Sequence, residues 1–198
     1  MSSAALTQPL IEPEWTLPSR GRVGMVSLIA AESAIFTIFV VAYIFYIGKS
    51  VSGPLPKNVL ELPILGTICL LSSSLTIHLA VRALQKSKMG AFRLWWFVTM
   101  TLGVIFLTGT GREWHRFIFE DGLTINTNLF GTTYYSLVGL HAFHVTVGLV
   151  AIALIMIFAL LGKVRQEHTE RIEVFSMYWH FVDVVWVVVF TVVYVIGR

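Results

Sequence analysis

The sequence predicts an all-α integral membrane protein, a bundle of five transmembrane helices, and two observations carry this prediction. The first is composition: 56% of the 198 residues are hydrophobic and 13% are charged, whereas a soluble domain usually has about 25% charged residues. The second is a set of five nearly uncharged windows, each close to or above the roughly 20 residues that cross the hydrocarbon core. These windows are residues 25–47, 62–81, 94–111, 129–162 and 174–197. Because lipid cannot satisfy the open edges of a sheet, all five are expected to be helices.

The remaining residues predict a short tail and four connections. Residues 1–20 contain Pro9, Pro13 and Pro18, which favour an extended cytoplasmic tail, and residues 21–198 form one membrane domain. No removable signal peptide is expected, so the first span acts as the insertion signal. The connections are expected to be a short turn at 49–57, a basic turn at 82–93, the longest loop at 112–128 and a mixed-charge loop at 163–173.

The basic residues predict the orientation in the membrane. Nine of the 14 Lys and Arg residues lie in the tail, in the turn at 82–93 and in the last loop. The positive-inside bias therefore predicts a cytoplasmic N-terminus and an external C-terminus. These residues lie at helix ends without an aromatic-interleaved basic patch, so no nucleic-acid partner is expected. The single Cys69 excludes a disulfide framework and a multi-cysteine zinc site.

Ionisable side chains inside the spans are the candidate functional residues, because they are expensive in lipid and need partners. Glu32 lies in the first span with no charged neighbour one turn away, so either another helix supplies its partner or the carboxyl stays neutral. His180 and Asp183 lie one turn apart in the last span and are expected to form a structural pair, with a proton relay as the alternative. His78 lies near the inner end of the second span.

His141 and His144 share a face of the fourth span. One interpretation is a haem or metal ligand pair, for which His180 is the candidate second helix ligand. The other, which we favour, is that both rings hydrogen-bond to neighbouring helices while nearby glycines allow close packing.

Several aromatic residues near the span ends are expected to anchor the protein at the lipid interface. Serines in the second span are expected to form a small-residue helix contact. The aromatic set is Trp95, Trp96, Trp114, Tyr178 and Trp179, and the serines are Ser72, Ser73 and Ser74.

Ordered motifs resemble subunit III of the haem-copper oxidases, in a short five-helix bacterial form, from about residue 20 to the end of the chain. The segment 178–186 reads YWHFVDVVW and is similar to the last-helix signature of that family. The segment 139–148 reads GLHAFHVTVG and resembles the family pattern Gly-x-His-Gly-x-His-Val-x-x-Gly. Glu32 stands where the family has an intramembrane glutamate. Residues 70–73 and the pair of Glu113 and Trp114 match further positions in order.

The resemblance implies a non-catalytic accessory subunit of a proton-pumping cytochrome c oxidase, whose subunit I holds the haems and copper. Such a subunit contacts subunit I directly, meets other oxidase subunits and membrane lipids, supports proton uptake and protects subunit I during turnover. We expect no catalytic residue, cofactor or metal in this chain, leave bound phospholipid open, and expect a multi-pass location in the bacterial cytoplasmic membrane. The proton- or lipid-related residues would be Glu32, His144 and Glu113, and the structural polar network would be His78, His141, His180 and Asp183.

Three alternatives stay open at this point. Within the family, the chain could serve a quinol oxidase or accompany nitric oxide reductase, because subunit III meets neither electron donor. From another class, it could be a stand-alone membrane haem b cytochrome using His141 or His144 with His180. A secondary transporter is disfavoured because the sequence shows no inverted repeat or interrupted helix.

Overall fold

The computed structural model describes residues 19–50 and 52–198, and these residues form helices and turns without a strand. Five helical runs are long and apolar enough to cross a membrane, which confirms the predicted all-α membrane bundle. They are α1 (Arg20–Tyr46), α3 (Ile64–Gln85), α4 (Met89–Phe119), α5 (Leu129–Leu160), and a continuous run of η1 (Gln166–His168), α6 (Thr169–Phe190) and η2 (Thr191–Ile196). A short helix, α2 (Pro56–Val59), precedes α3. Most of the predicted tail lies outside the described residues.

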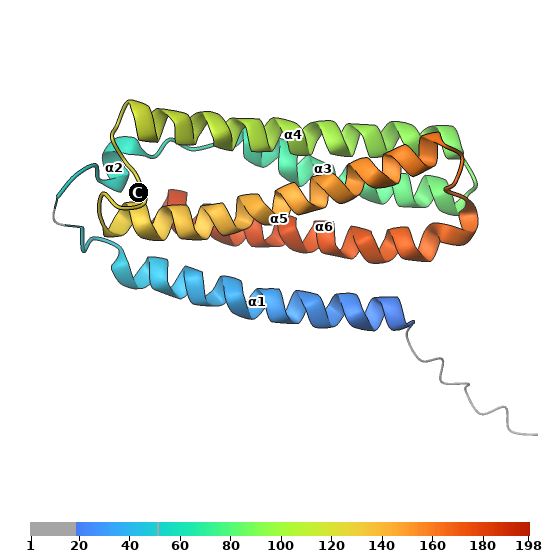
Figure 1. Cartoon of the computed structure of the whole chain (residues 1–198), viewed down its shortest axis with the longest axis horizontal. Coiled ribbons are helices and arrows are strands. Elements are labelled where there is room, and N and C mark those ends of the chain that lie inside the picture. The colour runs from blue at the N-terminus through green and yellow to red at the C-terminus, as the bar shows by residue number, and fades with distance from the viewer. Residues whose placement is uncertain (1–18, 51) are drawn as a thin grey trace, which may run out of the picture.

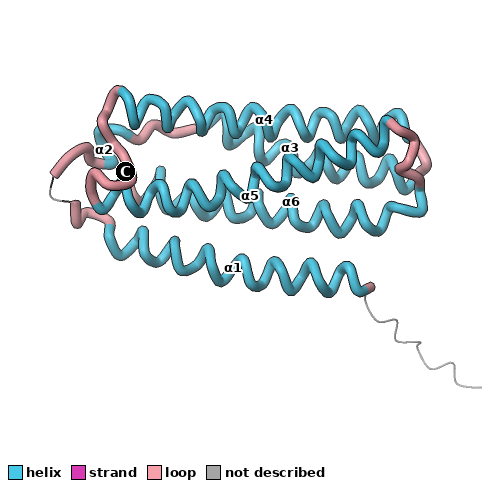
Figure 2. The backbone as a smooth tube through the Cα atoms, viewed as in Figure 1, coloured by secondary structure: helices cyan, strands magenta, loops and turns pink. Residues whose placement is uncertain are grey.

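The helices pack side by side along a common direction (Figure 1). Helix α4 lies along one edge of the bundle and packs mainly on α3, while α1 lies along the opposite edge and packs on α5 and α6. The α3–α4 and α5–α6 connections lie at one end of the bundle (Figure 2). The α1–α3 and α4–α5 connections and the C-terminus lie at the other end.

Three predicted connections are shorter than the sequence indicated. Helix α4 continues to Phe119, so the first half of the expected loop at 112–128 is helical, and α6 already begins inside the expected loop at 163–173. The turn expected at 82–93 is only residues 86–88, where Ser87 adopts a φ of 56°. Lys, Arg and Glu end a hydropathy window without ending a helix, because they are good helix formers. Their long side chains reach the interface from the last turns of a span.

Trp179 of α6 fills the centre of the bundle and is fully buried. A Cβ added at Gly148 of α5 would lie 2.7 Å from Cζ3 of this indole, and one at Gly103 of α4 would lie 3.1 Å from Cη2. The indole N–H donates to Oγ of Ser73 in α3 at 2.8 Å. One side chain therefore joins four helices, and the two glycines leave the space that it occupies.

The interfacial role expected of Trp96, Tyr178 and Trp179 is wrong, because all three are buried in the core. Their polar ends find acceptors inside the protein: Trp96 Nε1 donates to the backbone oxygen of Ile152 at 2.9 Å, and the Tyr178 hydroxyl donates to that of His144 at 3.1 Å. Burial of these rings is possible because each polar end has a hydrogen-bond partner inside the protein. Trp95 and Trp114 are only half-buried, so their anchoring stays a prediction.

We expect Gly148→Ala to lower the free energy of unfolding by about 1–3 kcal/mol, the usual cost of overpacking a core. The new Cβ would overlap the Trp179 ring at 2.7 Å. The measurement is thermal unfolding of the purified protein in detergent micelles. Gly111→Ala on α4 is the matched control, since its Cβ meets nothing within 4 Å. Equal stability of the two variants would contradict the role given to Gly148.

The orientation remains a prediction and can be tested with reporter fusions. A reporter that is active only outside the cytoplasm should work when fused after Arg198 and fail when fused before residue 1, because the basic residues concentrate at one end of the bundle. A C-terminal reporter that is active only in the cytoplasm would overturn the predicted topology.

Candidate functional site

An acidic side chain of α1 meets a histidine of α5 inside the bundle. Glu32 Oε2 lies 3.1 Å from Nε2 of His144, so another helix supplies the partner that Glu32 lacks on its own helix. His144 Nδ1 lies 2.8 Å from the backbone oxygen of Leu140. A carbonyl oxygen can only accept, so Nδ1 carries a hydrogen and donates it.

This geometry requires one proton between the two side chains. With a hydrogen on Nδ1, a neutral imidazole offers only a lone pair at Nε2, and an ionised carboxylate likewise offers only lone pairs. The hydrogen bond between Glu32 and His144 therefore contains either a protonated carboxyl and a neutral imidazole or a carboxylate and an imidazolium. Both states have zero net charge, which avoids the cost of an isolated charge in a low-dielectric interior.

The pair lies on the side of the bundle that α1 covers. The Glu32 side chain is 23% exposed and the His144 side chain 9%, and the ring of Phe36 packs 5.0 Å from the His144 ring, centroid to centroid. Helix α1 is the least covered of the five long helices, with 11% of its apolar window buried against 28% or more in the others. Glu32 can therefore be reached from the membrane side of α1.

His141 does not join a polar network, contrary to the expectation from the sequence. It is 1% exposed, and neither ring nitrogen has a hydrogen-bond partner within the described residues. Its ring stacks on Trp186 at 5.0 Å between centroids and meets Phe106 edge-on at 5.8 Å. This histidine serves as an aromatic packing residue, because its ring lies in the core against Phe106 and Trp186 and not beside Glu32.

Asp183 and His180 meet through a serine rather than directly. The Ser74 hydroxyl of α3 donates to Oδ2 of Asp183, and its oxygen lies 2.9 Å from Nδ1 of His180. A hydroxyl has a single hydrogen, so His180 donates its Nδ1–H to Ser74. The direct pair expected from their spacing is wrong, and Ser74, expected only to pack, bridges the two residues. The sequence signal that could have identified Ser74 is a hydroxyl in the middle of one span, combined with a carboxyl in another span that needs a donor.

His78 lies near this bridge without joining its hydrogen bonds. It lies one turn after Ser74 on α3, is exposed, and makes no hydrogen bond to any described residue. Its expected place in a structural network stays a prediction.

Glu113 forms another polar site, near the C-terminal end of α4. The Tyr194 hydroxyl donates to its Oε2 at 2.9 Å, and the Tyr134 hydroxyl lies 3.3 Å from that of Tyr194. Helices α4, α5 and η2 are joined by these groups. The sequence did not identify either tyrosine. A buried carboxyl needs hydrogen-bond donors, and hydroxyl groups on neighbouring helices are candidates for them.

The described residues bring no three His, Cys, Asp or Glu side chains together as a metal-binding group. A two-histidine haem would need His141 or His144 to face the same iron as His180. Both ring nitrogens of His144 and Nδ1 of His180 are already engaged in the hydrogen bonds described above, and the ring of His141 packs against aromatic residues. These histidines do not fit a haem ligand set. The Glu32–His144 pair fits a site that holds a proton.

Comparison with known proteins identifies relatives over most of the chain. The family model described as cytochrome c oxidase subunit III matches residues 20–198. The cytochrome c oxidase subunit 3 of a Synechocystis species is 37% identical, with 90% of this chain and 77% of the relative covered. That of Alkalihalophilus pseudofirmus is 34% identical, with 88% and 86% covered. A probable quinol oxidase subunit 3 of Staphylococcus saprophyticus is 29% identical, with 89% of each covered.

We expect Ser74→Ala to lower the free energy of unfolding by about 1–3 kcal/mol, because it leaves a buried carboxyl without its donor. In an Asp183→Leu background the same change should cost much less, since the acceptor is gone. Both values come from unfolding titrations in detergent micelles. Ser72→Ala, an exposed serine on the same helix, is the control and should be neutral. An equal cost of Ser74→Ala in both backgrounds would show that the bridge contributes nothing.

Proposed function

Because this chain belongs to the cytochrome c oxidase subunit III family, we propose that it is the accessory subunit of a proton-pumping cytochrome c oxidase, contacts subunit I directly, stabilises it and supports its proton uptake. Family membership makes the chain a multi-pass membrane subunit of a haem-copper oxidase whose partners are the other oxidase subunits. The proposal locates the complex in the bacterial cytoplasmic membrane. Haem and copper would belong to the partner subunits.

The observation that supports this role is the Glu32–His144 pair on the least covered helix. A partly exposed carboxyl inside a membrane span is costly when it faces hydrocarbon. A protein surface packed over α1 would remove that cost, and it would place the pair at an interface between subunits. Contact of α1 with subunit I therefore accounts for both the exposure of α1 and the position of Glu32.

The same pair can support proton uptake without acting in the redox chemistry. It holds one proton in a hydrogen bond of 3.1 Å, and the proton can reside on either side chain while the net charge stays zero. A second proton or the loss of the first would leave a net charge in a low-dielectric setting. A pair with this property passes protons along an interface and does not accumulate them.

A quinol oxidase is the second candidate for the complex. One relative is named as a probable quinol oxidase subunit 3, at 29% identity. In either complex the pair and its partner surface would act in the same way. Purifying a tagged form and identifying the accompanying subunit II, with or without a copper site, distinguishes the two.

We expect Glu32→Gln to leave the initial rate of oxygen reduction unchanged, because the amide keeps the shape and a hydrogen bond but not the ionisable proton. Activity should then decay faster during turnover, or proton uptake should slow at higher pH, where protons are scarcer. The measurement is oxygen consumption over time by the purified complex at two pH values.

Glu170→Gln is the control for this experiment, since it changes an exposed carboxyl in the first turn of α6. An abolished initial rate in a fully assembled Glu32→Gln complex would show that Glu32 takes part in catalysis. An unchanged time course at both pH values would show that the pair has no role in proton uptake.

A further inference from the structure

A series of tryptophan and tyrosine rings runs from the centre of the bundle toward the end that holds the C-terminus. Trp186 of α6 is 1% exposed, and its ring lies 6.2 Å from that of Tyr194, centroid to centroid. The Tyr194 hydroxyl lies 3.3 Å from that of Tyr134. The Tyr134 ring lies 5.3 Å from that of Tyr135, which lies 5.4 Å from that of Trp114. The ring series is therefore continuous from α6 through η2 and α5 to α4.

The two ends of this ring series differ in their surroundings. Tryptophan and tyrosine are the aromatic side chains that lose one electron most readily, and rings at these separations exchange electrons by tunnelling. Trp186 is enclosed by the core, and only the ring of His141 separates it from Phe36 of α1, with ring separations of 5.0 and 6.5 Å. Trp114 is half-buried near the end of α4. An electron can therefore travel between the side that α1 covers and the surface of α4.

One tyrosine of the series has an acceptor for its proton. A phenol loses an electron only when its proton leaves as well, because the radical cation of a phenol is a very strong acid. The Tyr194 hydroxyl donates to Oε2 of Glu113 at 2.9 Å, so a carboxylate is in place to receive that proton. The Tyr135 hydroxyl donates to the backbone oxygen of Leu123, which is a very weak base. Oxidation of the tyrosines therefore begins at Tyr194.

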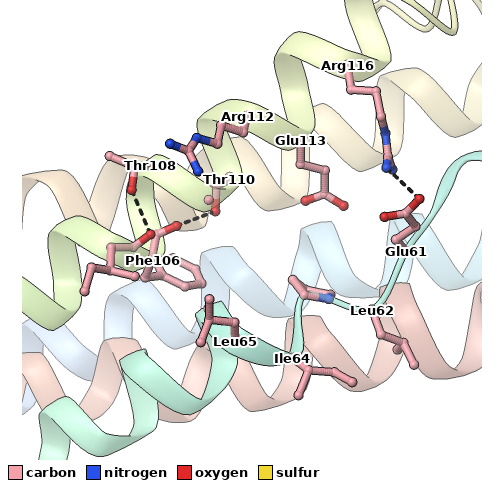
Figure 3. Close-up of a pocket in the computed structure, with 14 residues that line it drawn as sticks. Glu61, Leu62, Ile64, Leu65, Phe106, Thr108, Thr110, Arg112, Glu113 and Arg116 are labelled. Carbon is pink, nitrogen blue, oxygen red and sulfur yellow. Dashed lines mark hydrogen bonds and ion pairs between the residues drawn. The ribbon is translucent and has the colours of Figure 1, made fainter.

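Glu113 lies where it can take this proton and return it. Its carboxyl lines a groove of about 460 Å³ between the start of α3 and the second half of α4, and Figure 3 shows it between Arg112 and Arg116. These two arginines offset the charge of the carboxylate form. Oε1 of Glu113 has no hydrogen-bond partner among the described residues. The hydrogen bond from Tyr194 is thus the direct route for a proton onto this carboxyl.

We propose that the ring series carries single electrons from the surface of α4 to an oxidised group on the α1 side, while Glu113 holds the tyrosine proton. The oxidant is a tryptophan or tyrosine radical on a neighbouring subunit, formed when oxygen reduction stops short of water. For this oxidant alone, the inference rests on the proposed function. The electron comes from a one-electron reductant in the aqueous phase.

Electrons and protons balance at each step. Trp186 gives one electron to the oxidant, which takes a proton from its own surroundings. The resulting indole radical cation keeps its N–H, which donates to Oγ1 of Thr67 at 3.1 Å. Tyr194 then gives an electron to Trp186 and its proton to Glu113, and this removes a positive and a negative charge from a low-dielectric interior together. Tyr134 passes a hydrogen atom to the Tyr194 radical and becomes the radical itself.

The reductant restores the starting state. Its electron enters at Trp114 and reaches the Tyr134 radical through the ring of Tyr135. Glu113 returns its proton to Tyr194, whose own hydroxyl proton passes to Tyr134. The net result is one electron moved from reductant to oxidant, with every residue of the series unchanged.

The test treats the purified oxidase complex with hydrogen peroxide and measures the oxidation of each aromatic residue by peptide mass spectrometry. Without added reductant, Trp114 should be the main oxidised residue of the series, because the missing electron is finally drawn from it, and ascorbate should prevent this oxidation. Tyr194→Phe and Glu113→Gln should each abolish the oxidation of Trp114 and raise that of Trp186. Glu113→Gln is the sharper variant, since it keeps every ring and removes only the proton acceptor.

Tyr46→Phe and Glu120→Gln are matched controls at exposed positions outside the series, and both should oxidise as the native protein does. Where one of the test variants does not assemble, Tyr134→Phe replaces it, because it keeps the acceptor of Tyr194 and should also prevent oxidation of Trp114.

Oxidation of Trp114 that persists in the test variants would indicate direct attack on a surface indole and would overturn the proposal. Glu32 has no part in this route, so its failure in the proton-uptake experiment would leave the oxidation pattern unchanged.

Discussion

The burial of one indole against two glycines holds most of this bundle together. Trp179 belongs to α6, fits into space left by Gly103 and Gly148 on α4 and α5, and donates to Ser73 on α3. In a membrane, helices gain no hydrophobic free energy when they exchange lipid contacts for contacts with one another. The free energy of helix association must therefore come from close packing and interhelical hydrogen bonds. This side chain provides both. One ring thereby contacts α4 and α5 and is hydrogen-bonded to α3.

The features that depend on average polarity could be predicted from the sequence. Five windows of apolar residues became five long helices, because the hydrocarbon core requires a fixed length of satisfied backbone. The sequence also indicated that Glu32 needs a partner on another helix, because an unpaired carboxyl is costly in the hydrocarbon core. The family resemblance pointed to the same five-helix subunit.

The features that depend on which helix faces which could not be predicted in this way. Spacing along α6 suggested that His180 and Asp183 meet, but Ser74 on another helix lies between them. His141 has the same residue type and helix as His144, yet it packs among aromatic rings because it points into the core. Tryptophans near span ends are interfacial on average, and Trp179 is central because two glycines are opposite it.

Helix α1 is synthesised well before the side chains that hold it. Glu32 and His144 are 112 positions apart, and the ion pair of Arg22 with Glu173 spans 151. At about 5–20 residues per second, Glu32 spends roughly 6–22 s as part of a nascent chain before His144 is synthesised. During that interval its carboxyl has no imidazole, and the protonated form is the one that lipid tolerates. Helix α1 packs on α5 and α6, so it can take its place in the bundle only after both of these helices have been synthesised.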